Sequence, residues 1–255
     1  MKKFIYAFVA LAMIACVSPA LAKTPDALSF RRTLFAPAGQ RMLLLEAPLG
    51  MCFMDPSYYE EGEIAEDAKD ILEENGQGRL LGIFAPCMDI AAFDAGADDS
   101  ALRVSGIVTW LNIDGEESTR LSRADYLGLQ QEKFRETLDR RLVRGDDAPG
   151  GNDDAPSDDS STLSPAYAAL MLPWPGDYTL DKKAKATQDA VMLGYTADIS
   201  RDRVKYALSG VAATTVIKDT PIALYLSYTG AKPYDPAKVR ALAEKFMAQQ
   251  VVLNK

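Results

Sequence analysis

Hydrophobic and polar positions alternate most regularly in the last third of the chain. Three apolar runs, at 191–199, 204–217 and 222–228, are separated by short polar breaks. Side chains on a strand point to opposite faces with a period of two, so each run has one face to bury. Short polar turns between such runs predict an antiparallel meander, with its second turn at 218–221.

A helix is predicted to close the chain. Asp235 is a good N-cap, and Pro236 suits the first helical turn. A meander and a helix that each have one apolar side should pack on each other, which predicts an α+β fold, mainly antiparallel, with helices packed on the sheet. The apolar stripe of this helix consists of Val239, Leu242, Ala243, Phe246, Met247 and Val251.

Shorter elements are predicted upstream. Residues 23–40 have the pattern of an irregular entry segment, and strands are expected at 41–47 and 51–54. Ser57, with Glu60 three residues later, predicts a capped helix start. The next strand is expected at 80–87, and its continuation to residue 93 past a kink at Pro86 is left open.

Two further elements precede an acidic stretch. An apolar run at 102–113 predicts a strand, and Ser122 with Asp125 predicts the capped start of a helix to about Arg144. The residues that should face inward on this helix are Tyr126, Leu127, Phe134, Leu138 and Leu142.

The first 22 residues have the order of a Sec-type signal peptide. Basic Lys2 and Lys3 precede an apolar stretch that ends in the small-residue site 20–22. This order predicts export to the periplasm and a mature chain that starts at Lys23. A buried N-terminal helix and a lipoprotein signal with anchoring at Cys16 are the alternatives. No other stretch reaches the ~18 apolar residues of a membrane span.

The charge balance bears on partners. The chain has 28 basic and 36 acidic residues, a net charge of −8, and loss of two lysines with the signal gives 26 − 36 = −10. Such a chain repels phosphate backbones and anionic lipid surfaces, so a nucleic-acid partner is not expected.

Two cysteines, Cys52 and Cys87, remain after removal of the signal. An even pair in an exported protein predicts a disulfide, and a redox-active pair is the alternative.

The segment 145–161 differs in composition from the rest. It is rich in Asp and has no large apolar residue, which predicts a disordered acidic loop. A calcium site there is the alternative, although the EF-hand order is absent. The loop separates an N-terminal half at 23–144 from a C-terminal half at 162–255, and we expect one sheet shared by both halves.

The chemistry available is limited, because the chain has no histidine. This excludes Ser-His-Asp and Cys-His catalysis and His-ligated zinc, and no cofactor or metal is expected. Paired carboxylates remain as an enzyme class, with Asp89 the candidate for a partly buried acid. Trp174, which lies between two prolines, and nearby Tyr178 are the candidate binding residues.

The strand–turn–strand stretch Leu45-Glu46-Ala47-Pro48-Leu49-Gly50-Met51-Cys52-Phe53-Met54-Asp55, the following helix and the closing strands with a terminal helix carry a resemblance. The order resembles exported proteobacterial proteins of unknown function and, at the level of fold, the PsbP-like α/β/α sandwich. The resemblance implies a fold but no catalytic residues, and the acidic insert departs from it.

Three functions stay open. The first is a non-enzymatic periplasmic protein that binds an envelope partner or supports an envelope assembly. The second is a small-molecule or peptide binder with a pocket near Trp174. The third is a carboxylate-dependent hydrolase. Two convergent buried acids favour the hydrolase, an apolar groove favours the ligand binder, and a flat apolar patch favours the protein partner.

Overall fold

The predicted C-terminal meander forms the centre of the sheet in the computed structural model. β8 (Val191–Arg201), β9 (Val204–Ile217) and β10 (Thr220–Gly230) pair antiparallel in chain order. The β9–β10 turn has Lys218 and Asp219 at φ values of 47° and 58°, as in a type I′ turn, whose twist matches that of the flanking strands. The turn is shorter than expected, because residues 220 and 221 belong to β10.

The structure describes residues 30–74, 78–96, 104–111, 121–144, 178–181, 183–201, 204–230 and 234–255. The predicted signal peptide, the acidic loop at 145–161 and Trp174 lie outside these residues.

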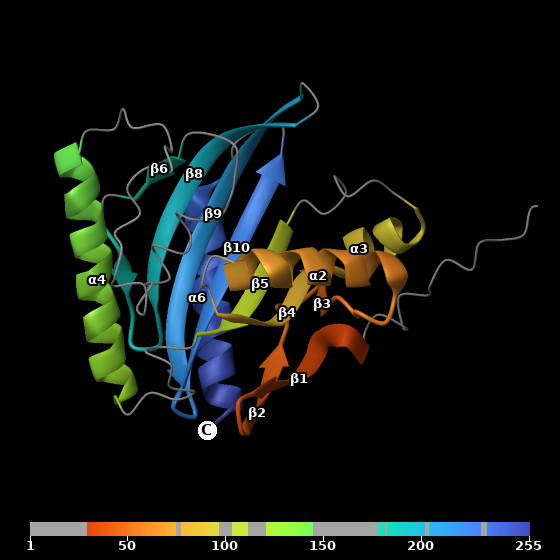
Figure 1. Ribbon diagram of the computed structural model, residues 1–255, viewed down its shortest axis with the longest axis horizontal. Helices are drawn as coiled ribbons and strands as arrows, with labels where there is room; N and C mark the ends of the chain where they lie inside the picture. Colours follow the sequence, from red (N-terminus) through yellow and green to blue (C-terminus); the bar gives the residue numbers. More distant parts are fainter. Residues whose placement is uncertain are drawn as a thin grey trace, which may run out of the picture.

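Strands from both sides of the acidic segment join one sheet (Figure 1). The strand order is β3-β4-β5-β10-β9-β8-β6, β7 also pairs with β8, and every pairing is antiparallel. This confirms the predicted α+β class. The remaining strands of this sheet are β3 (Met51–Phe53), β4 (Arg79–Pro86), β5 (Val104–Trp110), β6 (Tyr178–Leu180) and β7 (Lys185–Ala186).

Helices cover both faces of the sheet, as Figure 1 shows. α6 (Pro236–Leu253) packs on one face, where its buried stripe meets apolar residues of β8, β9 and β10. α2 (Tyr59–Glu74) and α4 (Arg123–Arg144) pack on the other face, and α3 (Cys87–Asp94) lies beside α2.

Local capping signals predict the starts of two of these helices correctly. The Asp235 carboxylate accepts a hydrogen bond from the Ala237 N–H at 2.9 Å at the start of α6. The Ser122 hydroxyl accepts the Asp125 N–H at 3.2 Å at the start of α4. In α4, Tyr126, Leu127 and Phe134 are buried as predicted. The side chains of Leu138 and Leu142 lie outside the described residues.

The entry segment contains a strand that the pattern does not predict. A short 3₁₀ turn, η1 (Phe30–Arg32), leads into β1 (Thr33–Ala38), which pairs with β2 (Arg41–Glu46) in a separate two-stranded hairpin. The inner face of the hairpin packs on the large sheet, where Leu34 lies close to Gly82 of β4. Burial by a distant strand, and not local propensity, keeps this segment extended.

One local expectation is wrong, and the strand continuation left open at Pro86 does not occur. The chain after Pro86 does not continue as a strand but turns into α3, with Pro86 at the N-cap. Ser57 does not cap α2, which begins at Tyr59, because its hydroxyl donates to the Asp55 carboxylate at 2.7 Å. Pro86 thus lies at the N-cap, one residue before the first helical position that proline prefers. Ser57 likewise lies one residue before the N-cap position that serine prefers.

Candidate functional site

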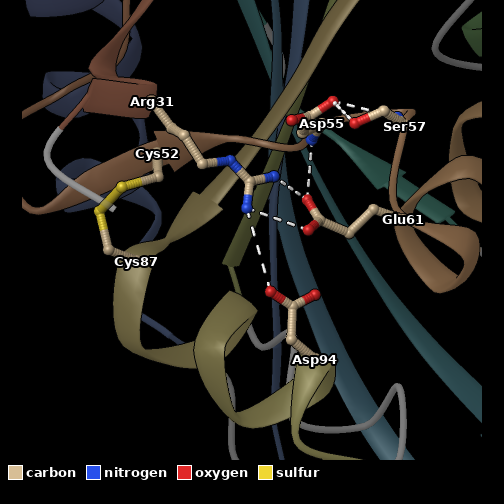
Figure 2. Close-up of polar contacts among 7 residues, drawn as sticks. All are labelled: Arg31, Cys52, Asp55, Ser57, Glu61, Cys87 and Asp94. Atoms are coloured by element: carbon tan, nitrogen blue, oxygen red, sulfur yellow. Dashed lines mark hydrogen bonds and ion pairs between the residues drawn. A yellow bond between two sulfur atoms is a disulfide. The ribbon is translucent and has the colours of Figure 1, made fainter. Parts of the chain in front are cut away.

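The two cysteines lie where β3 meets α3. Figure 2 shows the bond between their sulfur atoms. The S–S distance is 1.98 Å, the Cα atoms are 5.0 Å apart and 35 positions separate the two residues. Cys52 is buried in β3, and Cys87 is the first residue of α3. The predicted bridge therefore joins the edge of the large sheet to a short helix. Closing a loop of this length contributes roughly 3–4 kcal/mol on the chain-entropy model.

A polar cluster lies beside the bridge, and Arg31 is at its centre (Figure 2). Arg31 Nη1 donates to Glu61 Oε1 at 3.0 Å, and Nη2 donates to Glu61 Oε2. Arg31 Nη1 is also 4.0 Å from Asp94 Oδ2, and the guanidinium lies 5.6 Å from the centroid of the Tyr58 ring. One guanidinium thus links η1 to the first turn of α2 and the end of α3.

Glu61 is the most perturbed acid of this cluster. Its side chain is fully buried, and this burial raises the pKa of the carboxyl above its ordinary value of 4.5. The hydrogen bond with Arg31 and the Asp55 N–H, which donates to Glu61 Oε2 at 2.8 Å, lower the pKa in part. A hydrogen bond with Asp94 raises it again. The net effect is a carboxyl that holds its proton more tightly than a solvated one.

A carboxylate-dependent hydrolase needs two acids that converge on one point, and Glu61 and Asp94 both lie beside Arg31. Here, however, both oxygens of Glu61 accept hydrogen bonds from protein donors, and the side chain has no exposed surface to meet a substrate. The other candidate acid, Asp89, is half-buried in the first turn of α3 and is not part of this cluster. The cluster therefore acts as a link between elements.

The second candidate region is the β1–β2 hairpin and the end of α6, which lie side by side in Figure 1. Two side-chain amides, one in α6 and one at its C-cap, pair with the backbone edge of β2. Gln250 accepts the Glu46 N–H at 2.9 Å and donates to the Glu46 carbonyl at 3.0 Å. Asn254 accepts the Leu44 N–H at 3.0 Å and donates to the Leu44 carbonyl at 2.7 Å. The side chains at the end of α6 thus satisfy the backbone groups of β2 that a neighbouring strand would otherwise bind.

This arrangement fixes an apolar surface, which we call the hairpin–helix face. Residues 33, 35 and 37 of β1 and 42, 44 and 46 of β2 share the outer side of the hairpin. An open groove of about 530 Å³ continues from this side to α6, with Glu46 on its wall. The large apolar residues of the face are Phe35, Met42, Leu49, Val252 and Leu253, which are 68%, 54%, 83%, 62% and 36% exposed.

The charges around the groove are few. Arg32 Nη2 donates to Glu46 Oε1 at 2.8 Å, which neutralises both groups. Lys245 also lines the groove, is exposed, and makes no ion pair within the described part of the chain. One cation therefore stands beside an apolar surface.

The described residues exclude some alternatives within their own range. No three acidic or cysteine side chains come together there in a way that could hold a metal ion. No helix found there has the length and apolar character needed to cross a bilayer.

The residues singled out in the sequence are not brought together. Trp174 lies outside the described residues, and Tyr178 begins β6, at the far end of the strand order from β3. The hairpin–helix face was missed because β1 was missed. One signal could have indicated it: the run 42–45 is apolar at every position, so a strand there exposes apolar residues on its second face.

The fold and this face together define an α+β protein with one antiparallel sheet, helices on both faces and an appended hairpin. Comparison of the chain with models of protein families, with curated proteins and with solved structures finds no significant match. The resemblance to exported proteobacterial proteins and to the PsbP-like sandwich therefore stays a prediction.

Proposed function

We propose that this is an exported, non-enzymatic binding protein that engages an envelope partner through the hairpin–helix face. The observation that carries the proposal is the exposure of Leu49, Val252 and Leu253 around one groove. Phe35 and Met42 are exposed beside it, on the outer side of the hairpin. Soluble monomers rarely leave apolar surface of this kind contiguous and uncovered, and where they do it commonly marks an interaction site.

The chemistry of the face suggests the kind of partner. Leu49 and Val252 both line the groove and offer apolar contact, and Lys245, which also lines it, offers a positive charge. A partner segment with apolar side chains and a neighbouring acidic group would satisfy both. The open groove and the exposed outer side of the hairpin favour a protein surface over an enclosed small molecule.

Export belongs to the same proposal. The support for it is the order of residues 1–22 and the cysteine pair, which is typical of an oxidising compartment. An acidic chain with no histidine and a fully engaged Glu61 supports a role without catalysis.

The experiment is affinity capture from an envelope extract with matched variants. Val252→Glu places a charge on the hairpin–helix face, whereas Leu129→Glu places the same charge on α4, where Leu129 is 41% exposed. We expect the same partner to be captured by the wild type and by Leu129→Glu, and to be lost with Val252→Glu. Capture that is equal for all three proteins would contradict the proposal.

The non-enzymatic part has its own test. The wild type and Asp89→Asn should both fail to turn over a panel of glycosides, esters and peptides. Turnover by the wild type that Asp89→Asn abolishes, with the fold intact by circular dichroism, would refute this part.

A further inference from the structure

The two edges of the β1–β2 hairpin differ. The Ala47 N–H donates to the Arg32 carbonyl at 2.8 Å, which sets the alternation of hydrogen-bonded pairs along the ladder. Every second residue of β1 from Leu34 onward therefore points its backbone groups toward β2. Thr33, Phe35 and Pro37 point theirs away from β2.

The edge of β2 is closed by α6, but the edge of β1 pairs with no other strand among the described residues. It presents the N–H and carbonyl groups of Thr33 and Phe35 and the carbonyl of Pro37. A proline is tolerated within a strand where its missing N–H faces away from the sheet, as on this edge. The Phe35 side chain beside the edge is 68% exposed. An open edge with an apolar side chain is a template for pairing with another strand.

We infer that β1 pairs antiparallel with β1 of a second copy, about a twofold axis at Phe35. In this register the two Phe35 residues exchange both N–H···O=C bonds, and each Thr33 N–H meets the Pro37 carbonyl of the other copy. Every outward N–H then has an acceptor. The carbonyl that lacks a donor, opposite the proline nitrogen, is that of Thr33, at the exposed start of the strand, where water can bind it.

The side chains and charges at the edge of β1 are compatible with pairing to a second copy of the protein. The two Phe35 rings come to lie opposite each other on the same outer side, a favourable cross-strand aromatic pair. The two charged residues of the hairpin itself are already paired, because Arg32 pairs with Glu46 and Arg41 with Asp219 at 3.2 Å. The net charge of the mature chain, 26 − 36 = −10, acts at longer range and is screened within ~10 Å at 0.1 M salt. Dimerisation should therefore strengthen as salt is added.

This inference goes beyond the proposed function. Phe35 belongs to the hairpin–helix face but does not line the groove, which lies on the β2–α6 side of the hairpin, whereas the open edge is on the β1 side. Loss of partner capture in Val252→Glu and loss of the dimer are separate outcomes of separate measurements.

Sedimentation equilibrium of the mature protein tests the inference. We expect a monomer–dimer equilibrium, and Phe35→Pro should raise its dissociation constant about tenfold or more, because two central amide donors are lost per dimer. Met42→Ala removes a comparable apolar side chain from β2 and should leave the constant unchanged. Circular dichroism checks that both variants are folded.

Cross-linking tests the register. The twofold pairing places the two residues at position 35 about 5.5 Å apart at Cα, within reach of a disulfide. Mild oxidation should therefore link two copies of a Phe35→Cys variant but not of a Met42→Cys variant. Three outcomes would overturn the inference. The protein could stay monomeric at every concentration, or it could form a dimer that Phe35→Pro leaves intact. The third is that β1 pairs with a strand of another protein and not with a second copy, and that Phe35→Pro abolishes this binding.

Discussion

Replacing Gln250 with methionine should weaken the attachment of the hairpin to α6. The Gln250 side chain is fully buried and makes both of its contacts with β2 through the Glu46 backbone, at 2.9 and 3.0 Å. Its amide also donates to the Phe246 carbonyl at 3.2 Å. Methionine has a similar length and flexibility, so the change removes hydrogen bonds with little change in volume.

The expected magnitude follows from the groups left without a partner. The Glu46 N–H and carbonyl each lose their partner, and a buried unsatisfied polar group costs about 1–3 kcal/mol. These contacts are only partly buried, so the low end applies to each group, for a total of about 2–3 kcal/mol. For a chain of this size that corresponds to a melting temperature lower by roughly 5–10 °C.

Urea denaturation followed by circular dichroism measures this loss, and hydrogen exchange at the Glu46 amide locates it. Gln249→Met is the matched control, since Gln249 lines the groove without bonding β2. The control should keep the wild-type midpoint and protection. If Gln250→Met is as stable as Gln249→Met, the side-chain amides do not hold β2 and the reasoning fails.

Three further predictions concern the disulfide, the buried acid and export. Replacing Cys52 and Cys87 together with alanine should lower the unfolding free energy by about 3–4 kcal/mol. Thiol titration of the unfolded, unreduced mature protein, which lacks Cys16, should find no free thiol, and two reactive thiols would contradict the bridge. Burial raises the pKa of the Glu61 carboxyl above 4.5, so its contribution to stability is fully present below that pH and is lost as the pH rises through the raised value. The unfolding free energy of the wild type minus that of Glu61→Gln should therefore fall as the pH rises above 4.5, and a difference that grows with pH would refute this sign. N-terminal sequencing of the exported protein should begin at Lys23, and a lipid-modified start at Cys16 would overturn the cleavage site.

The parts of the fold that could be predicted are those whose signals are local. The meander follows from alternation within single strands, and the start of α6 follows from Asp235 beside Pro236. The prediction of the disulfide needed only two cysteines after a predicted signal peptide. These signals lie within a few residues or depend on composition, so the sequence of this chain is sufficient to predict the elements that they specify.

The parts that were missed depend on contacts between distant residues. β1 contains Pro37 and is held by packing on β4, far along the chain, so its own pattern suggested an irregular segment. The cluster joins Arg31 to Glu61 across 30 positions. The hairpin–helix face depends on Gln250, which meets Glu46 across 204 positions. Nothing within a short window of sequence indicates such a pairing.

The most direct test of the proposed binding face is site-specific photo-crosslinking in cells that export the protein. A photoreactive amino acid in place of Val252 lies on the face at a position that is 62% exposed, and the same group in place of Leu129 lies on α4. The proposal predicts one dominant protein adduct from position 252 and none from position 129. Equal labelling from both positions, or no adduct from position 252 in folded, exported protein, would contradict it.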